Sequence, residues 1–145
     1  SCISVVGREN YKEMGDYVYG EEMTLAVSPM PGALAAIRTL RASHELVVVT
    51  ARTGERSEFT ERWLSKWEET RGMRVVGVRT SEVPKLQVCQ DQGIGALIDD
   101  DERHFRDAAG FNMVSILFKQ DAPPNVHYDC AQVCRTWEEI ERLMA

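Results

Sequence analysis

Short apolar runs alternate with helix-like segments along nearly the whole sequence, and this alternation limits the fold more than any other feature. Five runs have the length and the Val, Ile or Leu content of strands that are covered on both faces. They comprise residues 2–6, 45–50, 74–78, 95–98 and 113–118. Consecutive strands separated by helices need crossover connections, and such connections produce a parallel sheet.

Helical patterns fill the intervals between these runs. Their expected starts carry a proline or a capping side chain, at Pro31, Ser57, Ser81 with Pro84, Asp101 and Thr136. Glu139 completes a capping box with Thr136. We expect glycines to end two of these helices, at Gly93 and at Gly110, the second in the left-handed conformation after a helix over 101–109.

The pattern therefore predicts an α/β fold, a three-layer α/β/α sandwich around a Rossmann-like parallel sheet. A length of 145 residues suits one domain over residues 1–145. Residues 11–28 lack clear periodicity, and we expect them to form a small flap over the strand ends.

Composition excludes several classes of protein. With 17 basic and 23 acidic residues, the chain is too acidic for a nucleic-acid-binding protein. No apolar run approaches the 20 or so residues that span a bilayer, so we expect no membrane partner. The four cysteines form no CxxC pair, which favours reduced thiols and a cytoplasmic location. Because the sequence begins at Ser1 and not at Met, we expect further residues before it.

Candidate ligand-binding residues follow the expected strands, because ligands of parallel sheets bind beyond the carboxyl ends of the strands. Thr50 ends one run, and its hydroxyl can donate to a phosphate oxygen; Arg52 follows closely. Lys85 starts a helix, where its ammonium suits a phosphate or a carboxylate. Asp99 and Asp100 end a buried run and suit a hard cation such as Mg²⁺. The alternative is that Asp100 or Asp101 only caps the following helix.

These features, taken in order, resemble the haloacid dehalogenase (HAD) superfamily, and within it the 5′(3′)-deoxyribonucleotidases, members with a minimal cap or none. The resemblance covers nearly the whole chain and includes the phrase Pro31-Gly32-Ala33-Leu34. It places Thr50 in the family's second motif, Lys85 in the third and the pair Asp99-Asp100 in the fourth. It implies that phosphate is bound by Thr50, Ala51, Arg52 and Lys85, and Mg²⁺ by Asp99 and Asp100.

The first motif departs from the family. Family members carry Asp-x-Asp-Gly there, with a nucleophilic and an acid/base aspartate. Aligning Gly7 with that glycine puts Ser4 at the nucleophile position and Val6 at the acid/base position. Serine needs a neighbouring base, and valine cannot transfer a proton. Loss of one carboxylate also predicts weak Mg²⁺ binding. Asp16 follows no apolar run, so it is a poor substitute nucleophile.

Three functions remain open, and the first is favoured. In the first, the chain is a pseudo-phosphatase, that is, a catalytically impaired homologue that binds a phosphorylated small molecule or a protein partner. The second is an active Mg²⁺-dependent phosphohydrolase of nucleotidase type. The third is an interaction scaffold in which Lys85 and Asp99 form a structural ion pair. Whether the chain is an enzyme is therefore open, and the changed first motif favours a protein without turnover.

Overall fold

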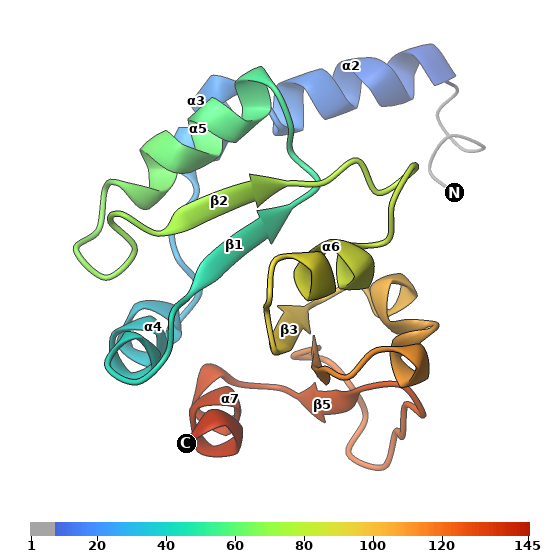
Figure 1. Cartoon of the computed structure of the whole chain (residues 1–145). Helices are drawn as coiled ribbons and strands as arrows, with labels where there is room; N and C mark the ends of the chain where they lie inside the picture. The colour runs from blue at the N-terminus through green and yellow to red at the C-terminus, as the bar shows by residue number, and fades with distance from the viewer. Residues whose placement is uncertain (1–7) are drawn as a thin grey trace.

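Parallel strands alternate with helices through the middle of the chain, whereas three described helices precede the first described strand and no helix lies between the last two strands (Figure 1). The computed structural model describes residues 8–145, with the side chains from Lys12 onward. The expected strand at 2–6, including Ser4 and Val6, lies outside the described residues. The other four expected runs are strands, namely β1 (Val47–Thr50), β2 (Arg74–Gly77), β3 (Ala96–Asp99) and β4 (Val114–Phe118). A fifth strand, β5 (Gln132–Cys134), was not predicted.

The described strands form two sheets, whereas the sequence predicts one. All pairings between them are parallel. β1 pairs with β2, and a second sheet has the order β3-β4-β5. In register, Thr50 lies opposite Gly77, and Asp99 lies opposite Leu117. The division falls between β1 and β3, since no described strand bridges them.

Helices connect the strands and flank the sheets. They are α2 (Arg8–Val18), α3 (Glu21–Ala26), α4 (Ala33–Arg41), α5 (Glu55–Leu64), α6 (Lys85–Asp91) and α7 (Trp137–Met144). Two short 3₁₀ helices, η1 (Glu102–Phe105) and η2 (Ala108–Gly110), follow β3. Most of the stretch 11–28 lies in α2 and α3, so it is more regular than the expected flap. No helix within residues 8–145 combines the length and the apolar character that crossing a bilayer requires.

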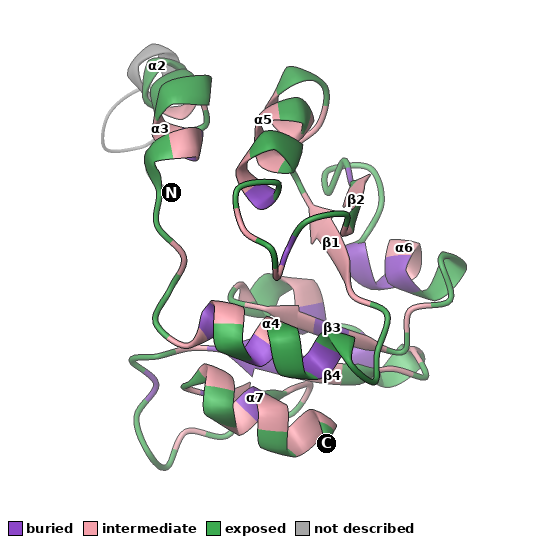
Figure 2. Cartoon of the chain, turned by 90° about the vertical axis from the view of Figure 1, so that its left-hand side faces the viewer, coloured by how far each residue is buried: buried purple, intermediate pink, exposed green. Residues whose placement is uncertain are grey.

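Two hydrophobic clusters lie on opposite faces of the β3-β4-β5 sheet. One joins Leu86 of α6 and Phe105 of η1 to Leu117 of β4. The other joins Leu40 of α4 and Ile140 of α7 to Ile116 and Phe118 of β4. Because successive side chains of a strand point to opposite faces, β4 contributes to both clusters. This arrangement confirms the predicted α/β class with helices on both faces of a parallel sheet (Figure 2).

Several helix ends differ from the prediction. α4 begins at Ala33 because Gly32, at φ 82°, forms the turn that precedes it, so Pro31 lies outside the helix. α5 begins at Glu55 after Gly54, at φ 61°, so Ser57 lies inside the helix and is not its cap.

The segment after β3 also differs. The expected helix over 101–109 is instead two short 3₁₀ helices, η1 and η2, and the Asp101 carboxylate caps η1 by accepting a hydrogen bond from the Arg103 N–H at 3.0 Å. Gly110 does not adopt the left-handed conformation. Gly93 does, at φ 72°, just beyond α6, as expected of a helix terminator.

Candidate functional site

The first cluster of predicted site residues lies where β1 ends. Thr50 is the last residue of β1, and its Oγ1 accepts a hydrogen bond from the Arg52 backbone N–H at 3.1 Å. This local bond holds the Arg52 backbone close to the end of β1. Ala51, between them, is exposed.

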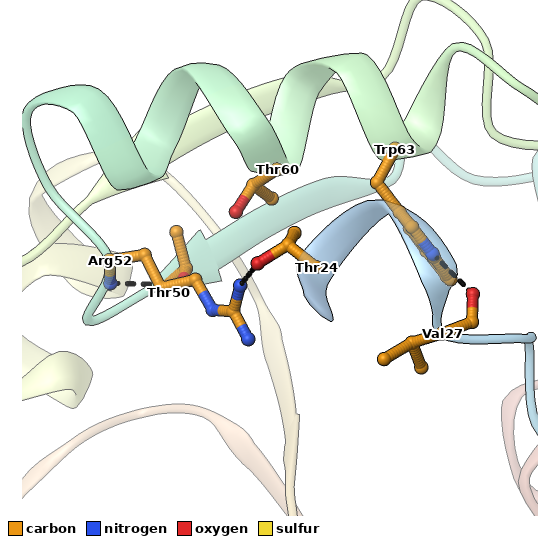
Figure 3. A pocket seen from close by; sticks show the side chains of 6 residues that line it. All are labelled: Thr24, Val27, Thr50, Arg52, Thr60 and Trp63. Atoms are coloured by element: carbon orange, nitrogen blue, oxygen red, sulfur yellow. Dashed lines mark hydrogen bonds between the residues drawn. The ribbon is translucent and has the colours of Figure 1, made fainter. Parts of the chain in front are cut away.

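A pocket of about 230 Å³ opens beside Thr50 and Arg52. Its lining contains one guanidinium, three threonine hydroxyls, an indole and one aliphatic side chain, from Arg52, Thr24, Thr50, Thr60, Trp63 and Val27. Figure 3 shows these side chains converging from β1, the loop after it, α3, α5 and the residue that follows α3. The lining is therefore rich in hydrogen-bond donors and carries a positive charge.

Arg52 is fixed in this pocket from two sides. Its Nη1 donates to Thr24 Oγ1 at 2.8 Å. Its guanidinium carbon lies 5.0 Å from the centre of the Tyr19 ring, within the range of a cation–π contact. Arg56 lies 5.3 Å from the same ring and pairs with Asp16 at 2.8 Å. The segment of α2 and α3 is thus bound over the end of β1.

α3 is positioned by its packing on α5. Arg62 of α5 pairs with Glu21 of α3 at 2.6 Å. The Trp63 indole N–H donates to the Val27 carbonyl at 2.7 Å (Figure 3). These contacts bring Thr24, which is 6% exposed, to the wall of the pocket.

The second cluster is a buried ion pair at the end of β3. Lys85, the first residue of α6, donates from Nζ to Asp99 Oδ2 at 2.6 Å. The two side chains are only 11% and 7% exposed. The other carboxylate oxygen, Asp99 Oδ1, accepts from the Asp101 N–H at 2.9 Å. Both oxygens of Asp99 therefore have partners within the protein.

The next two carboxylates have different environments. Asp100 is exposed. Asp101 caps η1, as the alternative interpretation of the sequence predicted, and pairs with Arg103 at 2.6 Å. Hydrogen bonds from the Arg103 guanidinium lower the pKa of Asp101 to about 2. His104 Nε2 lies 3.9 Å from Asp101 Oδ2, so this histidine faces the cap.

The expected magnesium ligands Asp99 and Asp100 have few ligating neighbours among the described residues. The Asp99 carboxylate is paired with the Lys85 ammonium, so a metal ion bound to Asp99 would compete with Lys85 for this carboxylate. No group of three or more His, Cys, Asp or Glu side chains suited to a metal ion occurs among the residues that the structure describes. Because Mg²⁺ often binds to only one or two carboxylates and keeps several waters, magnesium binding at Asp99 and Asp100 stays a prediction.

The structure thus places the predicted residues in two clusters. One contains Thr50 and Arg52, and the other contains Lys85 and Asp99, neither of which lines the pocket. Ala51 and Asp100 are exposed, and neither is among the residues that line the pocket. Sequence reasoning missed Thr24 and Thr60, because a threonine in a helix carries no signal of a pocket.

The chain was also compared with known proteins. Neither a scan against protein-family models nor a search among curated proteins finds a match, so the site is defined by the geometry of the chain's own residues.

Proposed function

We propose that this chain is a catalytically impaired, phosphatase-like domain of the HAD type that binds a phosphorylated small molecule without hydrolysing it. The observation that carries the proposal is the donor-rich pocket at the carboxyl end of β1. Arg52 supplies a planar guanidinium, which suits phosphate oxygens, and Thr24 and Thr50 supply hydroxyl donors, whereas the Thr60 hydroxyl already donates to the Arg56 carbonyl. The indole of Trp63 supplies an apolar wall for the organic part of the ligand.

Binding without turnover is supported by what lines the pocket. None of its described lining residues carries a carboxylate, an imidazole or a thiol. A threonine hydroxyl without a neighbouring base is a poor nucleophile. The sequence also offers Ser4 and Val6 where the family has its two aspartates, and these positions lie outside the described residues.

The Lys85–Asp99 pair supports a second candidate, the interaction scaffold. Its two charges satisfy one another within 2.6 Å and are nearly buried. An ion pair of this kind can order the end of a strand without any ligand. In the phosphate-binding proposal the same pair holds α6 against β3.

The proposal includes a cytoplasmic location and a protein partner as a further ligand. The location is supported by the free thiols of Cys89, Cys130 and Cys134, which suit a reducing compartment. The acidic composition, with a net charge of −6, argues against a nucleic-acid partner.

Isothermal titration with a panel of nucleoside monophosphates tests the binding proposal. Arg52→Gln should weaken binding about tenfold or more, because a hydrogen bond to a charged group is worth about 1.5–3 kcal/mol. Arg56→Gln is the matched control, since Arg56 also lies against Tyr19 but does not line the pocket. Equal affinities of the two variants would contradict the assignment of the pocket.

Release of inorganic phosphate separates the remaining functions. With Mg²⁺ present, the proposal predicts no turnover of any nucleoside monophosphate above the blank. Turnover that Asp99→Asn abolishes would identify an active phosphohydrolase. If no ligand binds and neither phosphate nor Mg²⁺ changes the melting temperature, the scaffold function is favoured.

A further inference from the structure

The pocket at the end of β1 has a polar end and an apolar end. At the polar end, the Arg52 guanidinium lies against the Thr24 hydroxyl (Figure 3). At the apolar end, the Trp63 indole lies beside Val27. Thr60 and Trp63 are three residues apart on α5, so they share the helix face that lines the pocket. The lining therefore changes from hydroxyl-bearing to apolar along the pocket.

The polar end carries a positive charge that no described acidic side chain neutralises. In the described part of the chain, the Arg52 guanidinium contacts a hydroxyl and an aromatic ring but no carboxylate. The hydroxyl oxygens of Thr24 and Thr50 accept hydrogen bonds from Arg52, at 2.8 and 3.1 Å. Each hydroxyl hydrogen can still donate, so this end suits an anionic group with several oxygen atoms.

The side-chain donors near the apolar end are already bonded within the protein. The Trp63 indole N–H, the one polar group of that side chain, donates to the Val27 carbonyl at 2.7 Å. The Thr60 hydroxyl, between the two ends, donates to the Arg56 carbonyl at 3.1 Å (Figure 3). Val27 itself is 53% exposed, so it leaves apolar surface next to the indole that carbon atoms of a ligand can cover.

We propose that the pocket selects phosphate esters with a small, apolar organic part, such as short alkyl phosphates, over sugar phosphates and nucleotides. This inference rests on the proposed phosphate-binding function and names the class of ligand. The phosphate group lies at Arg52, and the alkyl group lies against Val27 and Trp63. The pocket volume of about 230 Å³ is below the range of about 300–1,000 Å³ that is typical of drug-sized ligands, which also favours a small molecule.

Hydrogen bonding explains the selection. A sugar hydroxyl or a nucleobase at the apolar end would lose its bonds to water and find no free side-chain donor there among the described residues. A polar group that is buried without a partner weakens binding, whereas an alkyl group gains from burial. Arg52 therefore sets the affinity for every phosphate ester, while Val27 and Trp63 set the order among esters.

Isothermal titration with propyl phosphate and glycerol 3-phosphate tests the selection. The two esters have carbon chains of the same length and differ only in hydroxyl groups, so the ratio of their affinities isolates the effect of the apolar end. Propyl phosphate should bind about tenfold tighter or more. Adenosine monophosphate keeps the contact with Arg52 and should bind more weakly than propyl phosphate.

Val27→Thr adds a hydroxyl donor to the apolar end and keeps the shape of the side chain. It should reduce the ratio of affinities to about threefold or less, because glycerol 3-phosphate gains a partner. Val83→Thr is the matched control and should leave the ratio unchanged, since Val83 is 37% exposed but does not line the pocket. Arg52→Gln should weaken the binding of both esters alike.

Equal affinities for the two esters, or tighter binding of glycerol 3-phosphate, would overturn this inference and leave the phosphate-binding function intact. Binding of inorganic phosphate without either ester would have the same meaning. A ratio that Val27→Thr changes no more than Val83→Thr does would also refute the inference, because the apolar end would then not set the selection. If neither ester nor inorganic phosphate binds, the proposed function itself fails, and the inference fails with it.

Discussion

Replacing Lys85 by methionine removes the positive partner of a nearly buried carboxylate. Lys85 and Asp99 are 2.6 Å apart, with side chains 11% and 7% exposed. Removing one member of a buried pair costs about 3–5 kcal/mol, because the other charge stays buried without compensation. Asp99 keeps the hydrogen bond from the Asp101 N–H, so we expect about 3 kcal/mol, the lower end of that range.

Urea unfolding monitored by circular dichroism measures this loss. A decrease of about 3 kcal/mol should lower the melting temperature of a domain of this size by roughly 10 °C. Arg62→Met is the matched control: Arg62 and Glu21 are also 2.6 Å apart, yet both side chains are more than half exposed. An exposed pair contributes at most about 1 kcal/mol.

The double variant Lys85→Met/Asp99→Asn removes both charges. Neutral replacement of a buried pair is often close to neutral for stability, so we expect the double variant to recover most of the loss. If Lys85→Met costs no more than Arg62→Met, burial does not strengthen the pair and the reasoning is refuted.

Three further predictions concern pH, capping and thiols. Because the pKa of Asp101 is lowered to about 2, its ionised carboxylate stabilises the fold fully above about pH 4, and this contribution is lost as the pH falls towards 2. The urea midpoint of unfolding should therefore decrease between pH 5 and pH 2, and the decrease should be smaller in Arg103→Gln. Thr136 caps α7 by accepting from the Glu139 N–H at 3.2 Å, so Thr136→Ala should reduce the free energy of unfolding by about 1 kcal/mol, while Thr136→Ser should restore it. Burial raises the pKa of the Cys89 and Cys134 thiols, which makes both less reactive than Cys130. In a Cys2→Ser variant, Cys130 should therefore be the first cysteine to react with Ellman's reagent, and earlier reaction of Cys89 would contradict the packing of α6.

The sequence predicted the strands well where apolar runs are long. β1 to β4 coincide with four expected runs, because Val, Ile and Leu in succession indicate strands covered on both faces. β5 has only three residues, and its first residue, Gln132, is exposed, so the run was too short to detect. The capping signal of Asp101 was read correctly, but the segment that it caps is a four-residue 3₁₀ helix and not the expected helix over 101–109.

Only part of the candidate site could be predicted from the sequence. Thr50, Lys85 and Asp99 could be found because they stand at the ends of predicted elements. Thr24 and Trp63 could not, since they enter the pocket only through the packing of α3 against α5.

The order of strands and helices, and the polar residues at the strand ends, were determined by the sequence alone, because hydrophobic periodicity and capping are local properties. Tertiary structure decided which strands are neighbours, which edges stay open and which side chains share a pocket. Those features depend on contacts between residues far apart in the chain, such as Arg52 with Thr24 and Lys85 with Asp99. Local patterns carry no information about such contacts.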